Sequence, residues 1–142
     1  MNLMHLFDNN IGPHIASKIT TDIFTVNKQS GHPLRLWNKD IQEINSLLRE
    51  SRLLTLTAFS DTIESIESRH NCSVDWIHFL RYSLPTIVAG CYIDKRIQRK
   101  IMCISRITNL ACQREIKKSN VPELRAAILE WSSWLKELVD AG

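Results

Sequence analysis

The chain has 142 residues, of which 44% are hydrophobic and 23% charged, and its formal net charge is +3. This length suits one domain with one hydrophobic core, residues 1–142, and the composition argues against general disorder. The small positive charge permits an acidic partner but does not form the concentrated basic stripe that is typical of nucleic-acid-binding proteins. Glycine and proline number only four each. Few turns are therefore available to separate short strands, which favours helices.

The first predicted helix covers residues 13–28. The turn signal Asn9-Asn10-Ile11-Gly12-Pro13 precedes it. Apolar residues then recur at helical spacing, namely Ile15, Ile19, Ile23 and Val26. The segment NKQSGHP, residues 27–33, contains a glycine and a proline and ends the pattern.

A second helix is predicted to begin after Asn38, because asparagine is a common N-cap residue. Its inner stripe consists of Ile41, Ile44, Leu47 and Leu48, and we expect a bend or break near Ser51. A further stripe follows, made of Leu53, Leu56, Phe59, Ile63 and Ile66. A strand through LLTLT is rejected because no partner strand with suitable turn chemistry follows.

The segment SVDWIHFLRYSLPTIVAG, residues 73–90, predicts the most buried helix, over residues 74–92, with Asn71 and Ser73 as cap candidates. Pro85 inside it should remove one backbone hydrogen bond and bend the axis. Apolar residues cover most of its circumference: Val74, Trp76, Ile77, Phe79, Leu80, Leu84, Ile87, Val88 and Cys91. A helix that is apolar on nearly every side is buried by its neighbours. The predicted fold class is therefore all-α, with a helical bundle around this central helix.

Two amphipathic helices complete the bundle. Asp94 starts the first, whose inner face is Ile97, Ile101, Ile104, Ile107, Leu110 and Ala111, opposite Lys95, Arg99, Lys100 and Arg106. The last helix opens with Asn120 as the expected N-cap, Pro122 in the first turn and Glu123 as the acidic member of a capping box. Its expected inner residues are Leu124, Ile128, Trp131, Trp134, Leu135 and Leu138.

No pattern indicates a metal site, a cofactor or catalysis. The cysteines, at positions 72, 91, 103 and 112, form no C-x-x-C pair, and the histidines form no H-x-x-x-H pair. Three of the cysteines lie in apolar helical pattern, which favours free buried thiols in a reducing compartment. There is no glycine-rich phosphate loop and no G-x-S-x-G, and the row Asp61, Glu64 and Glu67 is interpreted as a charged helix face. We expect the protein not to be an enzyme.

The sequence also predicts no export signal and no membrane anchor. The start MNLMHLFDNN lacks a basic region, and the C-terminal LKELVDAG is charged. The longest uncharged run, Tyr82–Ile93, is shorter than the ~20 residues that a membrane helix needs. We therefore expect a soluble intracellular domain.

Three segments in order resemble the Bcl-2 family of apoptosis regulators, over roughly residues 70–142. The family's first homology segment reads roughly Asn-Trp-Gly-Arg before an apolar helix, and here Asp75-Trp76 precedes such a helix. The second homology segment has a Trp before an apolar-acidic-Leu run, and EWSSWLKELVD is similar at Trp134, Leu135, Glu137 and Leu138. Between them, IMCISRITNL resembles the family's sixth helix.

The resemblance implies a small anti-apoptotic member of the virus-encoded type, without a membrane anchor. It would inhibit apoptosis by sequestering a pro-apoptotic amphipathic helix of a host protein in a hydrophobic groove. Helices near residues 41–68 would wall this groove and the helix at 74–92 would form its floor. The implied groove residues are Phe59, Ile63, Ile66, Asp75, Trp76, His78, Phe79, Arg81 and Tyr82. The implied location is the host cytoplasm, with recruitment to mitochondria through partners.

The chain departs from the family pattern where an arginine normally pairs with the aspartate of the ligand helix. Ile77 and His78 replace the Gly and Arg. His78 would pair when protonated or as a neutral donor, and Arg81, one turn further on, is the other candidate. A narrow ligand range is expected because neither residue reproduces a bidentate guanidinium at the usual place. LTAFSDTI has features of the third homology segment, yet its position suits the fourth helix, so residues 54–66 stay open between the second and fourth family helices.

Two other functions stay open. One is a helical DNA-binding regulator that uses the basic face at residues 95–100, and the other is a helical adaptor or chaperone. We expect no nucleic-acid partner, because the basic helix lacks the short turn geometry of a helix-turn-helix pair. We interpret Trp76, Trp131 and Trp134 as packing residues, because tryptophan buries a large area wherever it occurs. A homodimer that covers the groove also stays open.

Overall fold

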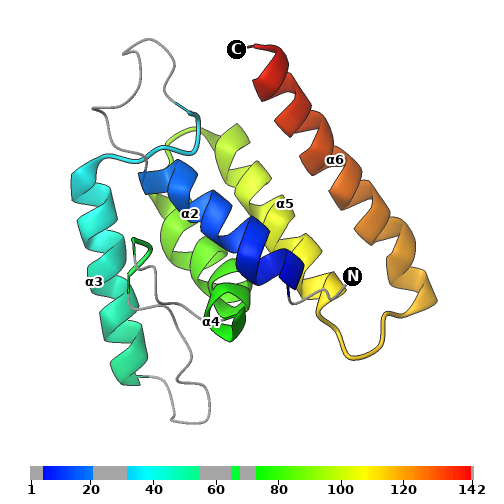
Figure 1. The fold of residues 1–142 in the computed structure, drawn as a ribbon, viewed down its shortest axis with the longest axis horizontal. Coiled ribbons are helices and arrows are strands. Elements are labelled where there is room, and N and C mark those ends of the chain that lie inside the picture. The colour runs from blue at the N-terminus through cyan, green and yellow to red at the C-terminus, as the bar shows by residue number, and fades with distance from the viewer. Residues whose placement is uncertain (1–4, 21–31, 55–64, 68–72, 142) are drawn as a thin grey trace.

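The computed structural model describes residues 5–20, 32–54, 65–67 and 73–141. Within these ranges every regular element is a helix, so the predicted all-α class is confirmed (Figure 1). The elements, in which η marks a π- or 3-10 helix, are η1 (Leu6–Ile11), α2 (Gly12–Thr20), α3 (Asn38–Leu54), α4 (Ser73–His78), η4 (Phe79–Val88), η5 (Ala89–Cys91), α5 (Lys95–Ala111), η6 (Lys118–Asn120) and α6 (Val121–Asp140).

The N-terminal helix begins earlier than predicted. The π-helical η1 leads directly into α2, so the turn expected at residues 9–13 is wrong. The break predicted at Gly12-Pro13 is instead the junction of two helical forms, where the amide of Gly12 donates to the carbonyl of Phe7, five residues back. Pro13 has no amide hydrogen to donate at this junction. Residues 21–28, the rest of the predicted helix, lie outside the described residues.

Helix α3 confirms the second predicted helix and continues past Ser51 to Leu54. The carbonyl of Trp37 accepts hydrogen bonds from the amides of Asp40 and Ile41, at 3.0 and 3.1 Å. Trp37 therefore occupies the N-cap position predicted for Asn38. Ile41, Ile44 and Leu48 are buried as expected, whereas Leu47 is exposed.

The segment that follows α3 was predicted to continue the apolar stripe. Its described part is a turn at residues 65–67, where Ile66 is buried and its amide donates to Oδ1 of the buried Asn45 at 3.1 Å. Leu56, Phe59 and Ile63 of the predicted stripe lie outside the described residues.

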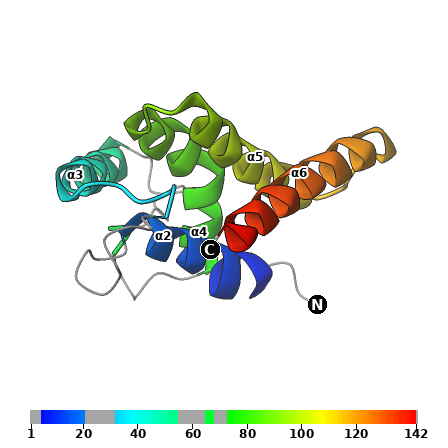
Figure 2. The same ribbon diagram turned by 90° about the horizontal axis from the view of Figure 1, so that it is seen from above.

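The predicted central helix exists, but it changes type along its length. It is α-helical at residues 73–78, π-helical from Phe79 to Val88 and 3-10 helical to Cys91. Pro85 lies inside the π segment. Phe79, Leu80, Leu84 and Val88 are fully buried, and the segment contacts both α3 and α5, which lie on either side of it (Figure 2). Tyr82 and Thr86 are exposed, so the expectation of burial on every side is corrected: one face reaches solvent.

Helix α5 follows its prediction closely. Asp94 is its N-cap, and its Oδ1 accepts from the amide of Arg96 at 2.8 Å. The predicted inner face packs inward, with Ile101, Ile104, Ile107 and Leu110 buried and Ile97 and Ala111 partly buried. The sequence pattern of α5 was sufficient because cap, stripe and charged face all point the same way.

Helix α6 runs antiparallel to α5 (Figure 1) and differs from its prediction in two ways. The Asn120 side chain makes no cap hydrogen bond, and Glu123 does not close a capping box but forms an ion pair with Arg106. The buried residues of α6 are Ala127 and Trp134, whereas Ile128 and Leu135, expected inside, are exposed.

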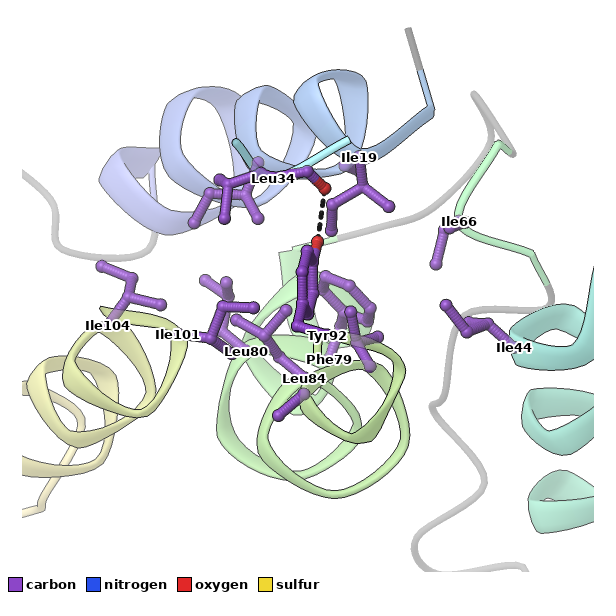
Figure 3. Close-up of a cluster of buried hydrophobic side chains, with 14 of the residues drawn as sticks. Ile19, Leu34, Ile44, Ile66, Phe79, Leu80, Leu84, Tyr92, Ile101 and Ile104 are labelled. Atoms are coloured by element: carbon purple, nitrogen blue, oxygen red, sulfur yellow. Dashed lines mark hydrogen bonds between the residues drawn. The ribbon is translucent and has the colours of Figure 1, made fainter. Parts of the chain in front are cut away.

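A buried tyrosine ties the loop before α3 to the centre of the molecule. Tyr92 Oη donates a hydrogen bond to the carbonyl of Leu34, among the side chains of Ile19, Leu80 and others in the core (Figure 3). Burial raises the pKa of the Tyr92 phenol. The hydroxyl therefore stays protonated and keeps its role as donor.

Replacing Tyr92 with phenylalanine is expected to lower the free energy of unfolding by about 1–3 kcal/mol, because the buried Leu34 carbonyl loses its donor. Urea denaturation measures this loss. Tyr82→Phe is the matched control, because Tyr82 is 53% exposed and Tyr92 is 7% exposed. Equal losses in the two variants would show that the buried hydrogen bond contributes nothing.

The histidine that precedes this loop predicts a dependence of stability on pH. His32 Nδ1 accepts a hydrogen bond from the amide of Leu34 at 3.1 Å. Burial, assisted by Lys18 and His14, lowers its pKa from 6.5. A lowered pKa in the folded state means that the unfolded chain binds the proton more readily. The neutral His32 therefore adds to the free energy of unfolding above about pH 6.5. This contribution is lost as the pH falls through the lowered pKa that His32 has in the folded state.

We expect the unfolding free energy of the wild type to fall between about pH 7 and about pH 5, and to fall less in His32→Ala. Denaturation at a series of pH values tests this expectation. The same slope in both proteins would assign the dependence to other groups.

Candidate binding groove along helix α5

An open groove of about 990 Å³ runs along α5, between α6 and the proline of η4. Its lining extends from Lys95 to Leu110, which corresponds to about 22 Å of helix. The apolar lining residues are Pro85, Met102, Cys103, Leu110, Ala126 and Ala127, and the polar ones are Lys95, Gln98, Arg99, Ser105, Arg106, Asn109, Glu123 and Glu130. The groove is therefore an elongated surface with an apolar base and charged edges.

The sequence of α5 explains its outer ridge. Lys95, Arg99, Met102 and Arg106 recur at helical spacing on the side opposite the buried isoleucines. On the facing helix, Ala126 and Ala127 carry only small side chains, and Cys103 Sγ lies 3.2 Å from the carbonyl oxygen of Ala127. The small residues keep the wall of the groove low, which leaves Met102 49% exposed in a basic ridge.

Ion pairs between α5 and α6 leave the groove with an excess of positive charge. Arg106 Nε lies 3.0 Å from Glu123 Oε1, and Lys100 Nζ lies 3.2 Å from Glu130 Oε1. These contacts neutralise the two carboxylates that line the groove. Lys95 donates to Gln98 at 3.3 Å, and Arg99 has no carboxylate partner within the described part of the chain. Arg99 is thus available to an anionic group of a ligand.

A second cation lies beside one end of the groove. Arg81 Nε donates to Oδ1 of the groove residue Asn109 at 2.9 Å, and its guanidinium lies 5.1 Å from the ring centroid of Tyr82. Arg81 is half-buried and forms no ion pair with a described carboxylate. The amide and the ring fix its position, and no carboxylate among the described residues compensates its charge.

The base of the groove also holds a buried hydroxyl. Ser105 is almost fully buried, and its Oγ has no hydrogen-bond partner among the described residues. Such a group costs about 1–3 kcal/mol of stability when it stays unpaired.

Ser105→Ala is therefore expected to raise the unfolding free energy, by up to about the same amount. A thermal shift assay measures the change, and a clear loss of stability would show that the hydroxyl has a partner in solution.

The structure distributes the groove residues predicted from the resemblance over different environments. Ile66, Trp76 and Phe79 are buried, and the Trp76 and Phe79 rings meet edge to face with centroids 5.8 Å apart. Asp75, His78 and Arg81 are half-buried, Tyr82 is exposed, and Phe59 and Ile63 lie outside the described residues. Of this set, Arg81 is the residue that contacts the α5 groove, through Asn109.

The tryptophans expected to pack do so to different degrees. Trp134 is buried and Trp131 is partly buried, with their ring centroids 5.2 Å apart. The α5 groove itself was missed by the sequence analysis. A signal was present in Met102, an apolar residue within the basic ridge, but nothing in the sequence placed α6 and Pro85 on either side of it.

The described cysteines are poorly suited to nucleophilic chemistry. Cys91, Cys103 and Cys112 are free thiols, and burial raises the pKa of each. A raised pKa lowers the thiolate fraction, and the thiolate is the reactive form. Cys72 lies outside the described residues.

Metal-binding clusters and membrane spans were searched for in the ranges that the structure describes. No group of three or more His, Cys, Asp or Glu side chains in these ranges is placed to hold a metal ion. No described helix is both long and apolar enough to cross a membrane.

Comparisons of the chain with protein families, curated proteins and solved structures find no match. The Bcl-2-like arrangement of the helices therefore rests on the sequence segments alone and is kept as a proposal.

Proposed function

We propose that this domain binds an amphipathic helix of a partner protein in the groove along α5. We further propose, on the resemblance of the sequence to the Bcl-2 family, that the ligand is a pro-death helix of a host protein and that its sequestration inhibits apoptosis. The observation that carries the proposal is that Arg99 pairs with none of the described carboxylates and lies beside the half-exposed Met102, in a groove about four helical turns long.

The groove suits a helix that is apolar on one face and acidic beside it. Four apolar side chains at i, i+3, i+4 and i+7 would cover the apolar lining, including Met102 and Ala126, and a carboxylate would reach Arg99 or Arg81. Four anchors that each bury about 150 Å² contribute about 15 kcal/mol at about 25 cal/mol per Å². Loss of translational and rotational freedom opposes this by roughly 4–15 kcal/mol. The balance supports reversible rather than permanent binding.

The proposed site differs from the groove that the resemblance implies. That groove requires the side chains of Trp76 and Phe79 at its floor, and both are buried in the core. Helix α5, along which the groove runs, lies on the other side of η4 from α3 (Figure 2). Arg81 is common to the groove that the resemblance implies and to the α5 groove. It is a candidate partner of the ligand aspartate in the first, and it borders the second through Asn109.

Nucleic acid is a weaker candidate for the same surface. Arg96 pairs with Asp94 and Lys100 pairs with Glu130, so two of the four cations at residues 95–100 are already compensated. Binding to a phosphate backbone gains its affinity from many uncompensated cations. An adaptor that binds a helix from a protein outside apoptosis is compatible with the same groove. The identity of the helix that binds distinguishes this role from the main proposal.

Fluorescence anisotropy with a panel of labelled pro-death helices tests the proposal, with an unrelated DNA duplex as the competing ligand. Arg99→Glu and Met102→Glu are each expected to weaken binding at least about tenfold, which corresponds to about 1.4 kcal/mol. Lys136→Glu is the matched control, because it makes the same charge change at an exposed position that does not line the groove. A loss of binding in Lys136→Glu as large as in Arg99→Glu would indicate attraction by net charge alone.

Further arms of the experiment separate the alternatives. Arg81→Ala should weaken binding by about 2–5 kcal/mol if this residue pairs with the ligand carboxylate. A loss of binding in His78→Ala but not in Arg81→Ala would instead assign the pairing to His78. Salt-sensitive binding of the duplex would favour a DNA-binding regulator. If no pro-death helix binds, the apoptotic part of the proposal is refuted.

A further inference from the structure

Helix α6 presents an apolar stripe that the described part of the chain does not cover. The helix spans Val121–Asp140, and its buried residues are Ala127 and Trp134. Val121, Ile128, Leu135 and Val139 are between 39% and 77% exposed. They lie on a different side of α6 from Glu123, Ala126, Ala127 and Glu130, which line the α5 groove. The exposed stripe is therefore separate from the proposed ligand site.

The spacing of this stripe is that of a helix seam. Residues 121, 125, 128, 132, 135 and 139 alternate in steps of four and three, which keeps them on one side of an α-helix along its whole length. Four of the six are apolar and the other two are Arg125 and Ser132. A seam of this kind is typical of a helix that packs against another helix of similar length.

The stripe is complementary to itself when it is reversed. With two α6 helices antiparallel about residue 130, Val121 faces the partner's Val139, and Ile128 faces the partner's Ser132, which places a large side chain against a small one. The stem of Arg125 lies over the partner's Leu135 while its charged end reaches water. The two Arg125 residues are then about 15 Å apart along the axis, whereas a parallel pair would place them side by side in the seam.

We propose that a second copy of this chain covers the α6 stripe, in an antiparallel dimer. A helix of this length presents a face about 30 Å long and about 10 Å wide, or about 300 Å² for each copy. Stable complexes bury about 800 Å² for each partner. The α6 pair is smaller than that, so the dimer forms reversibly and depends on protein concentration.

Analytical ultracentrifugation of the full chain over about 5–500 μM tests the dimer, at concentrations that span weak association. The wild-type mass should rise from 16.4 kDa towards twice that value. Ile128→Glu should stay monomeric at least to a tenfold higher concentration. Leu129→Glu is the matched control: Leu129 is also apolar, neighbouring and exposed, at 60%, but lies off the stripe. It should dimerise as the wild type does.

Val139→Glu guards against loss of the fold in Ile128→Glu, because Val139 is the more exposed of the two at 77%. Circular dichroism of each variant checks that the helices remain. A wild type that stays monomeric over the whole range overturns the proposal and assigns the stripe to another occupant or to solvent. Equal dimerisation of the wild type, Ile128→Glu and Val139→Glu overturns it as well.

Resonance energy transfer between single labels at 121 and 139 on different copies tests the orientation, and close approach of 121 to 121 would overturn the antiparallel arrangement.

Dimerisation and ligand binding have separate tests. The Arg99→Glu and Met102→Glu changes lie in the groove and should leave the dimer unaffected, while Ile128→Glu should leave helix binding unaffected. Failure of one proposal therefore does not decide the other.

Discussion

Replacing Trp76 with alanine is expected to lower the free energy of unfolding by about 3–5 kcal/mol, because it removes a large buried side chain and leaves a cavity that its neighbours fill only in part. Trp76 is 6% exposed and meets the Phe79 ring edge to face. It also lies against Gly12 of α2, so its indole joins the N-terminal helix to the central one. Guanidinium denaturation, monitored by circular dichroism, measures the loss.

Trp37→Ala is the matched control for this prediction. It is the same chemical change at a position that is 70% exposed, and its cost should stay within about 0.5 kcal/mol. Similar losses in the two variants would contradict the burial of Trp76 between α2 and η4.

The second large effect is expected at a glycine. A Cβ at Gly12 would lie 2.9 Å from the carbonyl oxygen of Phe7 and 2.9 Å from Cβ of Trp76. Real Cβ atoms do not approach other atoms so closely, so Gly12→Ala should force α2 away from α4 and cost about 1–3 kcal/mol, the usual range for overpacking. Chemical denaturation measures this change under the same conditions.

Gly90→Ala is the control, because a Cβ at Gly90 would meet nothing within 4 Å. Its effect should be close to zero or a gain of about 0.4–1 kcal/mol from a less flexible unfolded chain. In the Trp76→Ala background the cost of Gly12→Ala should shrink, because the contact at 3.0 Å with Cδ2 of the indole is removed while the contact with Cβ of residue 76 remains. Two glycine variants of equal stability would show that α2 and α4 are not in close contact.

The sequence predicted α5 well because its N-cap and its apolar face depend on residues within or next to the helix. The Asp94 side chain bonds an amide two residues away, and the isoleucine stripe repeats within the helix itself. The start of α3 was shifted by only one residue for the same reason, since any residue type can supply the backbone carbonyl that Trp37 uses at the N-cap.

Contacts between segments overruled local signals elsewhere. Asn120 and Glu123 match a capping box, yet Glu123 pairs with Arg106 on another helix, which an intrahelical motif cannot anticipate. The Gly12-Pro13 turn signal failed because the glycine serves the close approach of Trp76. Glycine and proline indicate special backbone demands, but a tight helix contact and a turn produce the same signal.

The amino-acid sequence by itself determined the all-α class, the position of the central helix and the two faces of α5, because each depends on periodicity and capping within one segment. Tertiary structure decided which surfaces stay open. Apolar residues of α6 lie on two sides of the helix, and packing on α5 covers only the side with Ala127 and Trp134 and leaves the exposed stripe open. The groove exists because the buried Ala127 and Trp134 hold α6 along α5, while the small side chains of Ala126 and Ala127 keep that wall low. Periodicity within one helix contains no information about the distance to the next, so neither surface was predictable before the helices were packed.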